Sequence, residues 1–132
     1  MPRNNSKCQT RRGSNTRLVL HNRRKDLPLS RQIVDIIPWN KKNKPTLNDL
    51  QSMLKAEGLQ CELYSDPAGT KYGRHQHDFD DFVVIVSGKM KLGTDNGVWM
   101  MNPGDRVDLP AHTVHWAEIM GKEEVKYLSA AK

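Results

Sequence analysis

Three histidines and one aspartate are spaced in this sequence as the ligands of a single metal ion would be. His75 and His77 are one residue apart, Asp81 follows closely, and His115 stands much further along the chain. Imidazole nitrogen combined with a carboxylate oxygen suits iron, manganese, nickel, zinc, cobalt or copper. The pattern therefore predicts one divalent transition metal per chain at His75, His77, Asp81 and His115.

Strands are the elements that would bring these side chains together. Side chains two residues apart on a strand point to the same face, so His75 and His77 would both reach one ion. The polar stretch 78–80 predicts a turn that returns Asp81 beside them on the next strand. His115 follows a proline-containing turn and is expected to come in from across the sheet.

The region from residue 59 onward predicts short strands separated by glycine and proline turns. Residues 59–63 alternate apolar and polar side chains, and 82–86 is an apolar run typical of a strand buried on both faces. Asn96-Gly97 indicates a hairpin. Further strands are expected at 90–92, 98–101, 107–109, 114–120 and 125–128. Seven or eight short strands at regular spacing favour an all-β sandwich or barrel.

One short helix is expected before the strands. Thr46 is a suitable N-cap, with Asp49 three residues later, and Gly58 stands where a C-terminal glycine ends a helix. The apolar face of this helix would consist of Leu47, Leu50, Met53 and Leu54. Such a helix is expected to cover one end of a sheet.

The charge of the chain is concentrated near its N-terminus. Residues 1–45 carry twelve Lys and Arg against two Asp, a net charge of +10, whereas 46–132 carry nine against thirteen acidic residues, a net of −4. We expect 1–45 to be a basic, largely disordered tail and linker, with a short strand at 31–39, and 46–132 to be the barrel domain. The tail would attract nucleic acid, but Trp39 is its one aromatic residue, so a solvated extension is favoured.

The cysteine content and the hydropathy of the chain limit its expected cellular location. Cys8 and Cys61 are the only cysteines, and their contexts do not predict a structural disulfide, so a reducing, cytoplasmic location is expected. No apolar stretch is long enough to cross a membrane, and no secretory signal is expected. Open sheet edges, and the apolar segment near residues 33–37, favour a homodimer.

The site residues also carry a family resemblance. Together with flanking turn residues they form two spaced groups, Gly69-x5-His75-x-His77-x3-Asp81-x6-Gly88 and Gly104-x5-Pro110-x4-His115. This arrangement resembles the two motifs of the cupin superfamily, over roughly residues 59–128. The resemblance implies a small single-domain cupin with a double-stranded β-helix, or jelly roll. It also implies a metal inside the barrel, with two coordination positions left open, and a dimer.

The sequence departs from the usual cupin pattern at several positions. Asp81 replaces the usual glutamate and is one methylene shorter, while Asp80 is a competing carboxylate that breaks the spacing. His112 stands where many members have glycine, and Ile119 where many have asparagine. Some cupins have lost their metal and act as binding modules, but four candidate ligands argue against that loss here.

Other polar and aromatic residues have ordinary structural explanations. Arg74 has the opposite strand parity to His75 and is expected to point outward. Tyr64 and Tyr72 could orient a substrate through their hydroxyls. A further group is expected mainly in the barrel core rather than lining a substrate pocket: Phe79, Met90, Trp99, Met101 and Trp116.

Two functions follow from these features. The first is a metal-dependent enzyme acting on a small molecule, with dioxygenase chemistry favoured by resemblance over isomerase or decarboxylase chemistry; its catalytic residues beyond the metal ligands are unknown. The second is a non-catalytic binding or regulatory module whose basic tail contacts nucleic acid or an acidic partner. The complete ligand set favours the enzyme.

Overall fold

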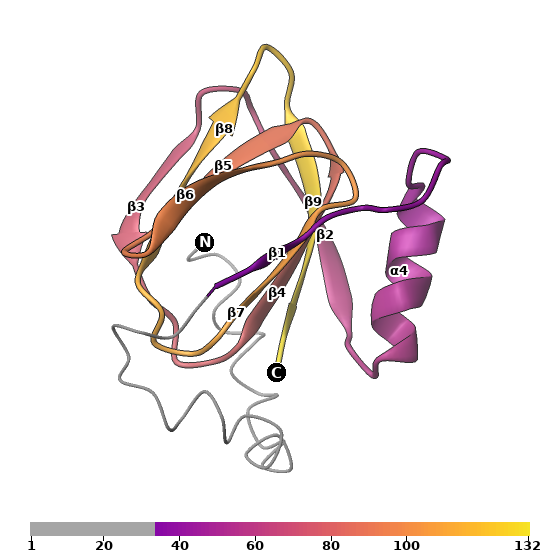
Figure 1. Ribbon diagram of the computed structural model, residues 1–132, viewed down its shortest axis with the longest axis horizontal. Helices are drawn as coiled ribbons and strands as arrows, with labels where there is room; N and C mark the ends of the chain where they lie inside the picture. Colours follow the sequence, from indigo (N-terminus) through magenta and orange to yellow (C-terminus); the bar gives the residue numbers. More distant parts are fainter. Residues whose placement is uncertain (1–33) are drawn as a thin grey trace.

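The computed structural model describes residues 34–132, so the expected disorder of residues 1–30 lies outside the described part. These residues form one helix and nine strands (Figure 1). The elements are, in chain order, β1 (Ile36–Ile37), α4 (Leu47–Ala56), β2 (Cys61–Asp66), β3 (Lys71–His75), β4 (Asp81–Ser87), β5 (Lys89–Thr94), β6 (Gly97–Met101), β7 (Arg106–Leu109), β8 (His115–Met120) and β9 (Val125–Ala131).

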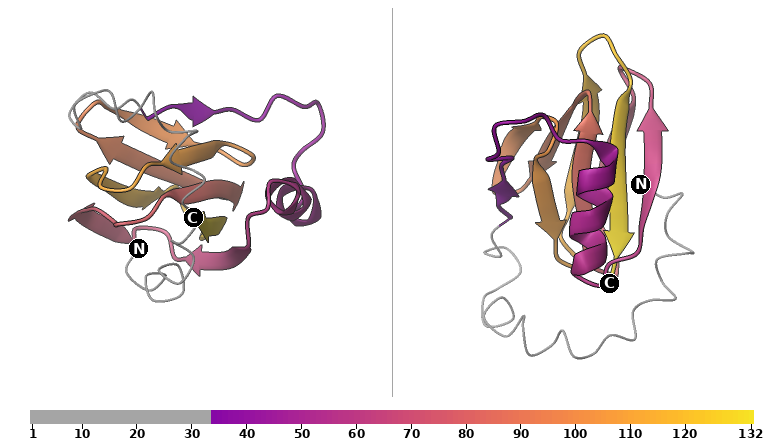
Figure 2. Two further views of the ribbon diagram at one scale, coloured as in Figure 1. Left: turned by 90° about the horizontal axis from the view of Figure 1, so that it is seen from below. Right: turned by 90° about the vertical axis from the view of Figure 1, so that its right-hand side faces the viewer.

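Two antiparallel sheets face each other to form the barrel. The larger sheet has the order β1-β7-β4-β9-β2, and the smaller sheet has the order β3-β8-β5-β6. Neighbours in space, such as β4 with β9 and β5 with β8, are distant in sequence. Figure 2 shows the two layers from below and from the side. The expected all-β jelly roll with one short helix is therefore confirmed.

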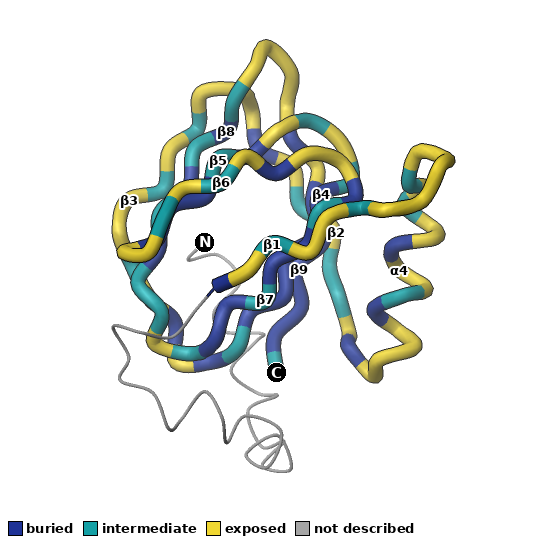
Figure 3. Tube along the Cα trace, viewed as in Figure 1, coloured by how far each residue is buried: buried dark blue, intermediate teal, exposed yellow. Residues whose placement is uncertain are grey.

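The core fills the space between the sheets. Val83 and Ile85 of β4 point into this interior, whereas Phe82 and Val84 point to the outer face of the same sheet. The run at 82–86 thus lies in a strand buried on both sides, as its composition predicts. Figure 3 shows that most residues of β4, β7 and β9 are buried. The remaining interior side chains include Met90, Leu92, Met101, Val107, Leu109, Ala117, Ile119, Val125 and Tyr127.

Helix α4 covers the outer face of the larger sheet, not one of its ends. The Thr46 hydroxyl accepts the Asp49 N–H at 3.1 Å, which caps the first turn. Gly58 has φ +77° and donates its N–H to the Lys55 carbonyl at 2.9 Å, as a C-terminal glycine does. Leu50 and Leu54 are fully buried and belong to one cluster with outward-facing residues of β4 and β9. Figure 2 shows the helix against this sheet.

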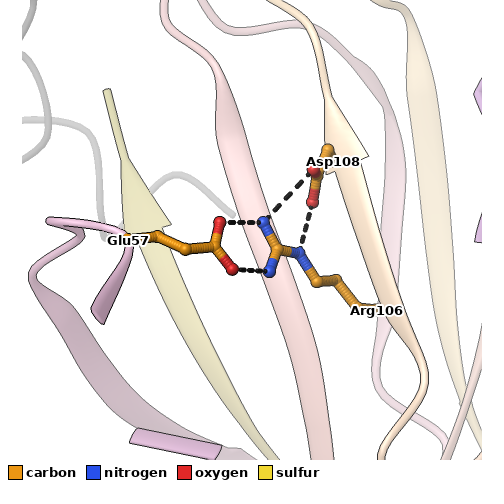
Figure 4. Close-up of polar contacts among 3 residues, drawn as sticks. All are labelled: Glu57, Arg106 and Asp108. Carbon is orange, nitrogen blue, oxygen red and sulfur yellow. Dashed lines mark hydrogen bonds and ion pairs between the residues drawn. The ribbon is translucent and has the colours of Figure 1, made fainter. Parts of the chain in front are cut away.

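A forked ion pair joins the end of the helix to the sheet. The Arg106 guanidinium donates to both Glu57 carboxylate oxygens, at 2.6 and 2.9 Å, and its Nε donates to Asp108 at 2.8 Å (Figure 4). It also lies over the Phe82 ring, 5.7 Å from the centroid. The Arg106 side chain is only 10% exposed, and the two acidic partners compensate its buried charge.

The segment before the helix packs onto the barrel. The expected strand within 31–39 is found at β1, which pairs with β7 of the same chain, and Val34 belongs to the interior core. The Asp105 carboxylate accepts the Trp39 N–H at 3.1 Å. Gly104 has φ +91° and lies so close to Trp39 that an added Cβ would be 2.5 Å from that side chain. The turn at 103–105 therefore anchors the incoming chain.

The expected hairpin is confirmed between β5 and β6. Its loop is Asp95-Asn96, because Thr94 pairs directly with Gly97, and the Thr94 hydroxyl accepts the Asn96 N–H at 3.1 Å. One local expectation was wrong. Trp116 lies on the outer face of the smaller sheet, where its indole covers Gly93. Among the described residues, no helix has the length and apolar character needed to cross a bilayer.

Candidate metal centre

Three histidines converge at one end of the barrel. One ring nitrogen from each of His75, His77 and His115 lies within 4.8 Å of the other two. His75 ends β3 and His115 begins β8, and they are directly opposed in the antiparallel register. Their ring centroids are 4.3 Å apart, and His77 lies 4.9 and 5.2 Å from them. The predicted histidines are therefore brought together.

His77 reaches the cluster from beyond the end of its strand. Strand β3 stops at His75, so strand alternation alone does not place His77. Its carbonyl instead accepts the His112 N–H at 2.6 Å, which ties the segment to the turn before β8. His112 has φ 67°, a conformation that glycine adopts most readily. The backbone of His112, and not its side chain, therefore connects this turn to His77.

Backbone carbonyls fix the orientation of two of the rings. His75 Nδ1 lies 2.6 Å from the Gly73 carbonyl, and His115 Nδ1 lies 2.8 Å from the Thr113 carbonyl. Because a carbonyl can only accept, each Nδ1 must carry the proton and each Nε2 keeps its lone pair. Metal-binding histidines commonly have this arrangement, which sets the tautomer and aims Nε2 at the ion.

Two of the imidazoles have buried nitrogens with no partner. Within residues 34–132, the Nε2 atoms of His77 and His115 are buried and make no hydrogen bond. His115 is 1% exposed, and the His77 ring stacks on Phe79 with centroids 4.8 Å apart. A buried polar atom without a partner is costly and calls for an explanation such as an ion. A metal between the rings would supply it.

Burial keeps the three imidazoles in their neutral form. It lowers the pKa of His77 to about 3 and that of His115 to about 4, and proximity of the other rings adds to both effects. Burial also lowers the pKa of His75, partly opposed by the Gly73 carbonyl. At neutral pH the rings are uncharged, which is the state that binds metal.

The spacing of the nitrogens fits a metal after a small adjustment. Two metal–nitrogen bonds of about 2.1 Å span at most about 4.2 Å. The nitrogens lie no more than 4.8 Å apart, so rotation of the imidazole side chains would close the group around an ion. The donor set, its neutral state and its unpartnered atoms therefore fit a divalent transition metal.

Asp81 faces the same interior but lies outside the histidine group. It is the first residue of β4 and shares its inward face with Val83 and Ile85. The Ser129 hydroxyl donates to its carboxylate at 2.7 Å, and burial raises its pKa to about 6, partly opposed by that hydrogen bond. The structure brings it into the barrel end but not into the cluster. Its role as a ligand stays a prediction.

Asp80, the competing carboxylate, has a structural role. Its Oδ1 accepts the Ala111 N–H at 2.8 Å, and its backbone pairs with Lys132 at 3.2 and 3.0 Å. These bonds hold the turn before β8 against the strand that carries Asp81. Asp80 thereby helps to position His115 from the opposite side of the site.

The other sequence candidates lie away from the histidines. Arg74 points outward, as expected, and pairs with exposed Asp95 at 2.6 Å. The Tyr72 hydroxyl donates to buried Asp66 at 2.9 Å, and the Tyr64 hydroxyl donates to Glu62 at 2.6 Å. Both tyrosine hydroxyls are thus engaged within the protein.

Sequence reasoning missed Ser129. It lies on β9, whose inward positions alternate as Val125, Tyr127, Ser129 and Ala131. A hydroxyl at an inward position of a buried strand is a signal that something polar lies opposite. The partner is Asp81, 48 residues earlier, which no local pattern indicates.

Comparison with known proteins places the chain in a family. The family described as "Cupin domain" matches residues 63–131, which is more than half of the chain. The matched region contains His75, His77, Asp81 and His115. A comparison with curated proteins found no match.

Solved structures agree on the fold. A cupin 2 domain-containing protein from Halorhodospira halophila superimposes with a TM-score of 0.58 at 16% identity, over 76% of this chain and 77% of that one. KdgF from Halomonas sp. gives 0.50 at 16% identity, over 74% and 79%.

A third similar chain comes from a study of the DMSP lyases RdDddP and RnDddQII. It gives a TM-score of 0.51 at 23% identity over 56% of this chain. The chain spans only 38% of the length of that protein. At these identities the likeness concerns the fold. Together with the family match and the two motifs, it shows that this chain belongs to the cupin superfamily as a small cupin domain.

Proposed function

We propose that this protein binds one divalent transition metal and is a metal-dependent enzyme acting on a small molecule. The observation that carries the proposal is the convergence of three neutral imidazoles, two of them with buried, unpartnered Nε2 atoms. His75, His77 and His115 would hold the metal, and Asp81 is the fourth candidate. Dioxygenase-like chemistry is favoured, with isomerase or decarboxylase chemistry behind it.

A metal held by His75, His77 and His115 would supply Lewis-acid or oxidation chemistry to a small oxygen-bearing molecule. The protein's own groups prepare the site for this. The Gly73 and Thr113 carbonyls hold the Nδ1 protons and so orient two rings. Phe79 stacks on His77 and shields that ring from water. The Asp81 carboxylate lies on the inward face of β4, where it can accept or return a proton.

Metal analysis of His77→Ala tests the proposal. Elemental analysis of the wild type is expected to find about one equivalent of a transition metal per chain, and the His77→Ala variant should lose it. His112→Gly is the matched control. It removes an exposed imidazole at φ 67°, where glycine is well tolerated, and leaves the three clustered rings in place. Failure of the wild type to bind metal after reconstitution would contradict the proposal.

Substrate screening then distinguishes the reaction classes. Iron in the protein would direct the search to compounds whose addition causes oxygen uptake. Zinc, nickel or manganese would direct it to isomerase or decarboxylase reactions. In each case turnover should follow the metal content of the preparation, and activity retained by metal-free protein would argue against the enzyme.

A second candidate function rests on the charge distribution. The net charge of +10 on residues 1–45 favours a binding module that contacts nucleic acid or an acidic partner. Replacing Arg11, Arg12 and Arg17 with Gln should then weaken binding to DNA or RNA and reduce its salt dependence. Binding that is unchanged by these substitutions would exclude a role for the tail.

A homodimer in the cytoplasm completes the proposal. Val98 and Met100 are 55% and 44% exposed on β6, an edge strand of the smaller sheet, which supports contact with a second copy. The segment around β1 pairs with its own β7, so it is not required for this contact. Light scattering should give twice the chain mass, and Val98→Lys should shift it towards the monomer.

A further inference from the structure

Asp81 lies in the barrel interior, but its carboxylate is not grouped with the three histidine nitrogens. Its register on β4 places it opposite Leu109 of β7 and Ala131 of β9, and it is fully buried. Ala131 packs against Phe79, which in turn stacks on His77. Asp81 is therefore paired with a residue of the same apolar cluster that contacts His77. Its carboxylate does not join the three ring nitrogens.

Ser129 provides the carboxylate with a partner inside the barrel. Ser129 is 4% exposed, and its hydroxyl donates to Asp81 Oδ1 at 2.7 Å. Hydrogen bonds to a charged acceptor are short and strong, and they weigh more where water is excluded. To bind a metal through this oxygen, Asp81 would have to give up the bond from Ser129.

The short side chain of Asp81 also keeps its carboxylate away from the histidine group. Aspartate is one carbon–carbon bond, about 1.5 Å, shorter than glutamate. The strand that carries Asp81 is fixed on both sides by its pairing with β7 and β9, so its backbone is not free to move inward. The shorter side chain reaches the hydroxyl of its neighbour on β9, not the histidine group.

We propose, resting on the metal site proposed above, that Ser129 holds Asp81 away from the metal and that the three histidines alone are its protein ligands. A six-coordinate ion would then keep three positions open, where a fourth protein ligand would leave two. Three positions accommodate a small molecule that chelates through two donor atoms, together with one further ligand. Asp81 becomes a positioning group that accepts a hydrogen bond from a molecule bound there.

Cobalt-substituted protein separates a three-ligand from a four-ligand site. Metal-free wild type and Asp81→Asn would be titrated with Co²⁺ against a competing chelator, and the visible spectrum recorded. Asn has the shape of Asp and can still accept the Ser129 hydroxyl. We expect its affinity within about threefold of wild type and an unchanged spectrum. A loss of affinity of tenfold or more, with a changed spectrum, would show that Asp81 is a ligand and overturn the proposal.

Two more variants keep the test decisive if Asp81→Asn does not fold. Ser129→Ala removes the hydroxyl that holds the carboxylate, and Asp81→Glu restores the missing methylene. The double variant, which lacks both restraints, should bring a carboxylate onto the ion, raise Co²⁺ affinity and change the spectrum from that of wild type, and Asp81→Glu alone should do so less. A double variant with no more effect than Asp81→Glu alone would refute a restraining role for Ser129. His77→Ala fails to bind Co²⁺ if the metal site itself is correct, so the two proposals fail separately.

Discussion

His75 and His115 face each other directly across β3 and β8, with ring centroids 4.3 Å apart and ring planes inclined by 58°. Each ring is held by a carbonyl two residues before it in the chain, Gly73 for one and Thr113 for the other. Two strands from different motifs therefore present their imidazoles in the same manner. This shared local geometry sets the same tautomer in both rings, and His77 joins the pair from beyond the end of β3.

Removal of His115 should abolish metal binding without unfolding the barrel. His115→Ala takes away a buried donor, and loss of a direct ligand should lower metal affinity by at least about 100-fold, the upper range for groups that act only behind a ligand. Competition with a chelator measures the affinity, and circular dichroism checks the fold. Affinity retained within tenfold would mean that the ion binds elsewhere.

Asp80→Ala should affect stability more than metal content. The change leaves the Ala111 N–H without its 2.8 Å acceptor and should cost about 1–2 kcal/mol in unfolding free energy. Asp80→Asn keeps an acceptor oxygen and should cost less. Both variants should still bind one equivalent of metal, because Asp80 is occupied by the turn. Loss of metal from both, with the fold intact, would instead support Asp80 as a ligand.

Gly104→Ala should destabilise the contact between the turn at 103–105 and the chain before the helix. Its φ of +91° disfavours a side chain, and the added Cβ would approach Trp39 to 2.5 Å. Urea unfolding should show a loss of about 2–4 kcal/mol. Gly69→Ala is the control, since Gly69 has φ +86° but nothing within 4 Å of the added atom. Gly69→Ala should lower the unfolding free energy by only about 1 kcal/mol. Equal losses in the two variants would show that the clash with Trp39 does not contribute.

The Glu57–Arg106 pair should make stability depend on pH in the acid range. Hydrogen bonding to Arg106 lowers the pKa of Glu57 below its ordinary value of 4.5, so the unfolded chain takes up this proton first. The stabilisation is therefore complete above about pH 4.5 and is lost as pH falls through the folded pKa. Because Glu57 is 46% exposed, screening limits the effect to about 0.5–1 kcal/mol.

Glu57→Gln isolates this contribution. Urea unfolding at pH 7 should show the variant less stable than wild type, and the difference should shrink as the pH falls below about 4.5. Asp108 still pairs with Arg106 in the variant, so the guanidinium keeps one carboxylate partner. A difference that stays constant over this range would show that protonation of Glu57 does not contribute.

The sequence predicts much of this architecture because its local signals are strong. The apolar run at 82–86 and the Thr46 cap each depend on neighbouring residues alone, and both expectations are confirmed. The spacing of the histidines likewise predicted their convergence. His77 shows the limit, because it lies past the end of β3 and depends on His112, on a turn far along the chain.

Long-range pairings account for what the sequence did not reveal. Arg106 meets Glu57 across 49 residues, and Ser129 meets Asp81 across 48. Each pair joins elements whose relative placement is set by the strand order of the larger sheet. Without that strand order, the sequence shows Arg106 only as a charged residue on one strand and Ser129 only as a hydroxyl on another.

The burial of the site has a consequence for how a metal would enter it. The Nε2 atoms of His77 and His115 are buried, and Phe79 stacks on the His77 ring, whereas His75 is only half-buried. An ion or a small molecule would therefore reach the two buried nitrogens from the side of His75. The exposed flank of this imidazole thus makes His75 the residue at which the rate of metal uptake, and not only the affinity, should respond to substitution.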